Sequence, residues 1–147
     1  MAGTNQLSGL APGGSLALRP QTRALADASA WPVRADDDTL LPFQKLDIYK
    51  VAKELCRLVH EAKIRDPELR DQATRASKSA FLGLCEGLPS DSSGIRRRHF
   101  DIANTSLHEL IGATDLSETI RVLDSETAQR ILVLSIRFKR MLRSLPR

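Results

Sequence analysis

The stretch "FLGLCEGLPSDSSGIRRRHF", from Phe81 to Phe100, joins the end of one helical pattern to the start of another. Its apolar run reaches Glu86 and Gly87, and a glycine near a helix end can adopt a positive φ and close the helix. The polar segment "PSDSSG" then breaks the pattern, and its serine and aspartate side chains can cap the next helix. Because the connection is short, the two helices are predicted to be antiparallel neighbours.

Apolar stripes at three-four spacing extend on both sides of this stretch and predict four helices in all. The stripes are Ile48, Ala52, Leu55, Val59 and Ala62; then Leu69, Ala73, Ala76, Ala80, Gly83 and Gly87; then Phe100, Ala103, Leu107, Leu110 and Thr114; and finally Ile131, Leu134, Phe138, Met141 and Leu145. Asp66–Pro67 separates the first pair of helices, and Asp124 or Ser125 starts the last helix. The second stripe consists mostly of small residues, so another helix is expected to approach it closely.

These patterns predict an all-α protein, an antiparallel up-down four-helix bundle over residues 41–147. Residues 1–40 are rich in Gly, Ala, Pro and Ser and lack a sustained period, so they are predicted to be a disordered tail. Aromatic residues make up only 4% of the 147 residues, which suits helices better than a sheet.

The charge balance indicates an anionic partner, because the chain carries a formal net charge of +4. The excess is uneven: from Ala128 to the end there are six basic residues and no acidic one. No apolar run approaches the roughly 20 residues of a membrane span, so no membrane association is expected. Cys56 and Cys85 lie within helical patterns, as free thiols of a reducing compartment do, and a cytoplasmic location is expected.

The sequence offers little for an enzyme, and we expect neither activity nor cofactor. A di-iron bundle needs Glu-x-x-His pairs, and none of the glutamates has a histidine three residues on. A metal or hydrolytic site could be drawn from Cys56, His60, Cys85 and His108. The simpler interpretation, which we favour, is a core cysteine beside a half-buried histidine.

Glu86 needs a partner, because a carboxylate in the last turn of a helix faces the negative end of the helix dipole. The loop Ser90–Ser93 offers hydroxyl and N–H groups, and Ser106 and His108 lie on the following helix. We expect Glu86 to fix the turn between the two helices; a catalytic carboxylate is the alternative.

Arg96, Arg97 and Arg98 stand where a helix is predicted to begin, and cations at that end oppose the helix dipole. Phosphate is the natural ligand for such a cluster beside the N–H groups of a helix start. The alternative is a solvated charge run partly neutralised by Asp91 and Asp101. The full set of expected nucleic-acid contacts is Arg96, Arg97, Arg98, Arg137, Arg140, Arg143, Arg70 and Lys78.

The apolar stripes are wider than one bundle core requires, which is typical of an oligomer interface. Beside the small stripe of the second helix runs another with Ser77, Phe81, Leu84 and Leu88, and Leu132, Val133 and Leu142 widen the face of the fourth helix. We therefore expect a homo-oligomer.

Three segments resemble a bacterial four-helix-bundle family named for reading frames in intervening sequences of 23S ribosomal RNA. They are "FQKLDIYKVAKEL" (Phe43–Leu55), "CEG" (Cys85–Gly87) and "FDIANTSLHEL" (Phe100–Leu110). The resemblance implies a ring, commonly a pentamer, and a distant relation to basic accessory bundles of retroelement reverse transcriptases, which bind the transcriptase and nucleic acid. By position in these motifs, Glu86, Gly87, Ser106 and Glu109 would be the family's polar signature.

The sequence therefore predicts a non-enzymatic oligomeric bundle that binds RNA or a nucleoprotein partner through its basic surface. Contacts would be mainly to phosphate, since few aromatic side chains lie among the basic groups. The alternative is a protein-interaction scaffold whose basic residues only solvate the surface.

Overall fold

The computed structural model describes residues 40–146, and almost all of the predicted tail lies outside them. The described residues form a short 3-10 helix and four α-helices. Their bounds are η3 Pro42–Lys45, α2 Asp47–Glu61, α3 Pro67–Gly87, α4 Ser93–Thr119 and α5 Ser125–Ser144. The predicted all-α fold with four helices is confirmed, and η3 was not predicted.

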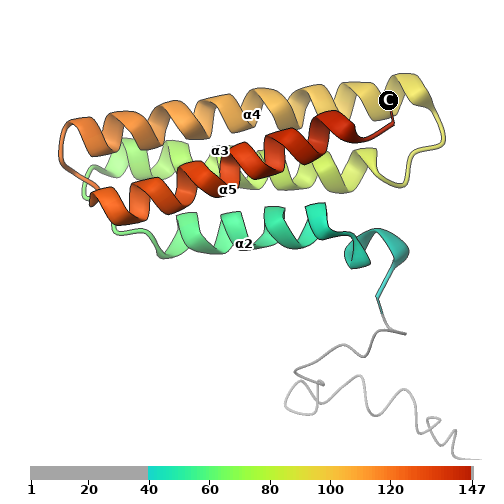
Figure 1. Ribbon diagram of the computed structural model, residues 1–147. Coiled ribbons are helices and arrows are strands. Elements are labelled where there is room, and N and C mark those ends of the chain that lie inside the picture. Colours follow the sequence, from blue (N-terminus) through green and yellow to red (C-terminus); the bar gives the residue numbers. More distant parts are fainter. Residues whose placement is uncertain (1–39, 147) are drawn as a thin grey trace, which may run out of the picture. The chain divides into compact units, whose positions relative to one another are not determined.

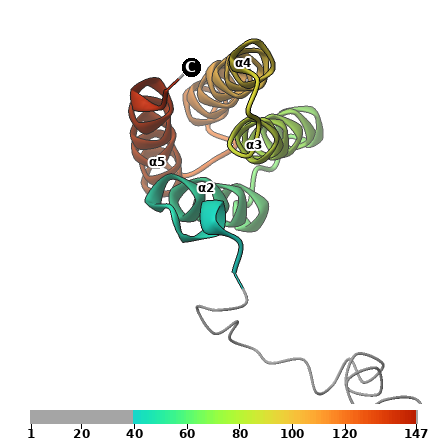
Figure 2. The same ribbon diagram turned by 90° about the vertical axis from the view of Figure 1, so that its right-hand side faces the viewer.

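Successive helices run in opposite directions in Figure 1, and Figure 2 shows the four packed around a common core. Each helix contacts the next in the chain, and α5 also contacts α2, which closes the bundle. The loop between α3 and α4 therefore lies at the same end as the last turns of α5 (Figure 1). The other end holds the α2–α3 and α4–α5 loops, where the backbone N–H of Arg65 donates to the carbonyl of Val122 at 3.0 Å.

Aspartate and serine side chains start the three longer helices. Asp66 Oδ1 accepts from the N–H of Leu69 at 2.9 Å, and Asp124 Oδ1 accepts from Thr127 at 2.8 Å. Ser92 Oγ accepts from Ile95 N at 3.5 Å, so α4 begins at Ser93. The arginine triplet consequently lies in the second turn of α4 rather than at its start, where the helix dipole opposes cations less than expected.

The seam between α3 and α4 is closely packed because its residues are small. Ala73, Ala76, Ala80 and Gly83 are all buried. A Cβ on Gly83 would lie 2.9 Å from the carbonyl oxygen of His99, so the two backbones nearly touch. The expected close approach to the small stripe is therefore present, and α4 is the helix that makes it.

The exposed apolar surface of the bundle lies only partly on the two stripes that were expected to supply it. The second stripe of α3 belongs to the core, since Leu84 is fully buried and Phe81 and Leu88 pack against the core. On the widened face of α5 only Leu142 is buried; Leu132 is partly buried and Val133 is exposed. Large exposed apolar side chains remain on the three longer helices and near the first. They are Leu41, Leu46, Leu82, Ile95, Ile102, Leu116, Ile120, Val133 and Ile136.

Candidate nucleic-acid interface

Two groups of predicted contact residues come together at one end of the bundle, which we call the basic end. It consists of Arg97 and Arg98, in the second turn of α4, with Arg137, Arg140 and Arg143 on the second half of α5. Because α4 and α5 run in opposite directions, these stretches lie toward the same end (Figure 1). All five side chains are exposed.

Most of the basic end is unpaired. Arg97 Nε lies 3.9 Å from Asp101 Oδ2, an exposed and long ion pair. Within residues 40–146, the side chains of Arg98, Arg137, Arg140 and Arg143 form no ion pair or hydrogen bond. Like charges at one end of the bundle repel one another, and an anionic ligand would relieve that repulsion.

Arg96 differs from its two neighbours. Its Nε and Nη2 atoms donate to the carbonyl oxygen of Ser90 at 3.1 and 2.5 Å, and the side chain is partly buried. Arg96 thus holds the loop between α3 and α4, so its guanidinium has fewer free donors for a phosphate than those of Arg97 and Arg98.

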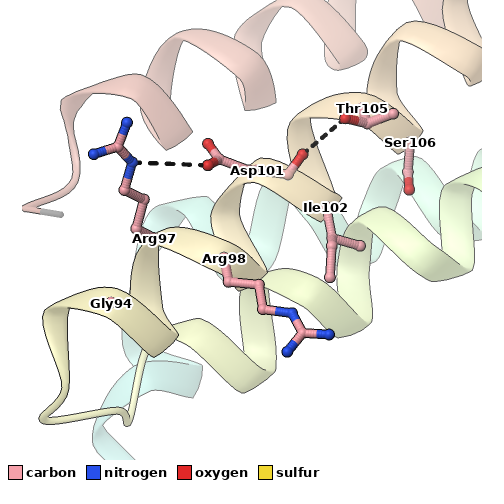
Figure 3. Close-up of a pocket in the computed structure, with 7 residues that line it drawn as sticks. All are labelled: Gly94, Arg97, Arg98, Asp101, Ile102, Thr105 and Ser106. Atoms are coloured by element: carbon pink, nitrogen blue, oxygen red, sulfur yellow. Dashed lines mark hydrogen bonds and ion pairs between the residues drawn. The ribbon is translucent and has the colours of Figure 1, made fainter.

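The outer surface of α4 carries an open groove that includes two residues of the triplet. Figure 3 shows its lining in two rows, Arg97, Asp101 and Thr105 on one side and Arg98, Ile102 and Ser106 on the other, with Gly94 at the end. A second hollow on α5 is bordered by Val133, Ile136, Arg137, Arg140 and Met141. Both arginine groups of the basic end therefore border concave surface.

Arg70 and Lys78 lie apart from this group. Arg70 is in the first turn of α3, at the opposite end of the bundle, and Lys78 is midway along that helix. The sequence had grouped them with the arginine triplet by charge alone. The fold places them away from the basic end.

The four polar-signature residues all contact the partner helix across the α3–α4 seam. Glu86 Oε2 lies 2.9 Å from His99 Nδ1, Gly87 lies against Phe100, Ser106 Oγ donates to Ser79 Oγ at 2.8 Å, and Glu109 Oε1 accepts from Gln72 Nε2 at 2.8 Å. The signature therefore sets the register of two helices.

Two details of that seam differ from expectation. The partner of Glu86 is His99, not the loop, Ser106 or His108, and the contact has the distance of an ion pair without hydrogen-bond alignment. Gly87 does not adopt a positive φ; it is glycine because Phe100 occupies the space of a side chain. The only described non-glycine residue with a positive φ is Arg121.

The cysteines and histidines show no metal-site geometry. Among the described residues, no three His, Cys, Asp or Glu side chains are grouped so that they could hold a metal ion. Cys56 Sγ donates to the carbonyl of Ser77 at 3.2 Å, and burial raises the pKa of the Cys56 thiol to about 11. Burial also raises the pKa of Cys85. Both thiols stay protonated at neutral pH, which makes them weak nucleophiles.

Sequence reasoning missed two exposed side chains beside the arginines, Ile95 and Ile102. Both lie on the outer face of α4, three residues before and four residues after Arg98. The signal was present in the sequence, since this spacing places all three on one helix face. They were overlooked because neither belongs to the core stripe: Ile95 precedes it, and Ile102 falls between Phe100 and Ala103.

Comparison with known proteins gives one family. The model of the family described as "23S rRNA-intervening sequence protein" matches residues 44–144, which covers α2 to α5. This confirms the resemblance seen in the three sequence segments. No curated protein matches the chain. None of the helices in the described part of the chain has the length and apolar character that crossing a membrane requires.

Proposed function

Because the chain belongs to the 23S rRNA-intervening sequence protein family, we propose that it is a non-enzymatic, self-associating bundle that binds RNA phosphates at its basic end. The RNA can be free or part of a nucleoprotein. The observation that supports this most directly is the set of exposed arginines on α4 and α5, four of which lack a partner among residues 40–146.

The chemistry of the basic end favours phosphate. Guanidinium groups present several N–H donors that match phosphate oxygens, and their charge persists at any physiological pH. Contacts of this kind position a nucleic-acid backbone without reading its sequence. Binding should therefore weaken steeply with salt and show little base preference.

Self-association and a cytoplasmic location complete the proposal. Val133 and Ile136 are 53% and 43% exposed on the outer face of α5, and Met141 borders the same hollow. A second copy would cover this apolar surface. In an assembly the basic end repeats in each subunit, so several weak phosphate contacts add up through avidity.

The test is a salt titration of binding to a fluorescent RNA oligonucleotide, followed by anisotropy. Changing Arg97, Arg98, Arg140 and Arg143 to glutamine should reduce the slope of log affinity against log salt by roughly 0.7 to 0.9 for each lost phosphate contact. Arg70→Gln is the matched control, because it removes one exposed arginine at the opposite end. A quadruple variant that binds as the parent does would refute the basic end as the RNA site.

A protein-interaction scaffold is the second candidate function, and the exposed apolar surface on α5 favours it. It predicts self-association that survives the quadruple substitution, together with no RNA binding by the parent at low salt.

A further inference from the structure

The groove on α4 combines positive charge with uncovered apolar surface. Ile102, which lines the groove one turn after Arg98, is 41% exposed. Ile95, one turn before Arg98 and beside the lining, is 53% exposed. Arg97 and Arg98 lie at the same end of the groove as Gly94, and Ile102 lies between the arginines and the hydroxyl-bearing residues (Figure 3). A ligand that fits this arrangement has an anionic group and, beside it, an apolar face.

Two simpler occupants fit less well. Helix α5 of a second copy could cover Ile102, but its outer face would bring Arg137 and Arg140 toward Arg98, which has no anionic partner among residues 40–146. The backbone of an RNA duplex could neutralise Arg98, but it has no apolar surface for Ile102, because paired bases are stacked inside the helix.

An unpaired nucleotide offers both features. We propose that the groove binds single-stranded RNA, with a phosphate at Arg98 and the face of a neighbouring base on Ile102, which lies in the same row of the lining (Figure 3). Every base has such a face, so this contact tolerates any sequence; Ile102 takes the place that aromatic rings have in other single-strand sites. The inference rests on the proposed function and narrows it from RNA in general to unpaired segments.

The far end of the groove supplies hydrogen-bond acceptors. The Thr105 hydroxyl donates to the carbonyl of Asp101 at 3.0 Å, and the Ser106 hydroxyl donates to Ser79 at 2.8 Å. With its proton engaged, the exposed Thr105 oxygen presents lone pairs, which suit a ribose 2′-hydroxyl or a base amino group. The Ser106 hydroxyl is buried in the α3–α4 seam and only borders the groove. Asp101 also borders the groove; it accepts from such groups and repels a phosphate, which places the phosphate toward Arg98.

The experiment compares a labelled single strand with a hairpin duplex of the same length, using the full chain and anisotropy. Ile102→Ala should weaken single-strand binding about fivefold and leave the salt slope unchanged, because it removes apolar contact but no phosphate contact. Arg98→Gln should shallow the slope by roughly 0.7, the value for one phosphate of a single strand. Leu116→Ala is the control, since Leu116 is 48% exposed on the same helix but outside the groove.

Each part of the inference is contradicted by a different experimental outcome. Equal or tighter binding of the hairpin would overturn the choice of single strands while leaving the proposed function intact. An Ile102→Ala variant that behaves as Leu116→Ala does would remove the base contact. Loss of self-association rather than RNA binding in Ile102→Ala would make the groove a protein interface. Absence of binding to either RNA would defeat the proposed function itself.

Discussion

A side chain on Gly87 would occupy the same space as Phe100: its Cβ would lie 2.4 Å from Cε1 of that ring. Phe100 is only 1% exposed and fills the core where α3 meets α4. The glycine of the "CEG" motif is therefore a packing position, and the ring of Phe100 fixes how far α4 stands from α3.

Gly87→Ala should destabilise the bundle by roughly 1–3 kcal/mol, the usual cost of forcing a methyl group into a packed core. Urea unfolding measures the change. Gly112→Ala is the control, because Gly112 is within α4 with open space around it. That variant should be more stable by up to about 1 kcal/mol, since alanine favours a helix interior. Equal effects at the two glycines would contradict the packing role.

Arg121 occupies a position that suits glycine. Its φ is 60°, and the N–H groups of Arg121 and Val122 donate to the carbonyls of Glu118 and Ser117 at 2.9 Å each, which is the Schellman pattern at a helix end. Arg121→Gly should raise stability by about 1 kcal/mol, because a left-handed conformation disfavours residues with a Cβ. A melting temperature at or below that of the parent would contradict this explanation, and Arg121→Lys should leave it unchanged.

Helix starts and the helical faces could be predicted because they depend on local sequence. Asp66 and Asp124 cap the helices that the sequence assigned to them. The partner of Glu86 and the space beside Gly87 depend on the register of α3 against α4, which no local pattern specifies. In the structure Phe100 and His99 both lie against the end of α3, where Phe100 contacts Gly87 and His99 contacts Glu86.

The candidate site was predicted less completely than the fold. Arg97 and Arg98 were identified by charge, and Arg137, Arg140 and Arg143 were brought to the same end by the direction of α5 (Figure 1). Charge alone could not distinguish Arg96 from Arg97 and Arg98, because its hydrogen bonds to the carbonyl of Ser90 depend on the path of the α3–α4 loop.

Asp124 predicts a stability change in acid. The N–H of Thr127 donates to its carboxylate and holds the pKa of Asp124 below its ordinary value of 3.8. The folded state therefore binds this proton less readily than the unfolded chain, so the stabilisation is complete above pH 3.8 and is lost as the pH falls through the lower folded pKa.

Asp124→Asn keeps a capping oxygen without the titration. We expect nearly parental stability at neutral pH and a smaller loss below pH 3.8, measured by urea unfolding across the acid range. A variant with the same acid loss as the parent would show that other carboxylates account for it.

The exposed apolar side chains of α5 predict where subunits meet. Val133→Lys together with Ile136→Lys should convert the assembly to monomers at micromolar concentration, because a charge there cannot be buried without a partner. Light scattering gives the mass, and circular dichroism checks that the helices persist. Leu116→Lys is the control on α4, with comparable exposure, and should leave the mass unchanged. A parent that is already monomeric would refute self-association.

Substitutions at Arg96 and Arg98 should affect different properties: the first the stability of the fold, the second the binding of RNA. Arg96→Gln removes two hydrogen bonds from a charged donor to Ser90 and should lower stability by about 1 kcal/mol. The salt slope of RNA binding should stay close to that of the parent, because these donors already serve the loop. Arg98→Gln should do the reverse, with stability within about 0.5 kcal/mol of the parent and a shallower slope. Arg96→Lys keeps the charge but not the paired donors, so it should lose stability in the same direction as glutamine does. If Arg96→Gln instead shallowed the slope without lowering stability, Arg96 would be a phosphate contact and the loop contact would be incidental.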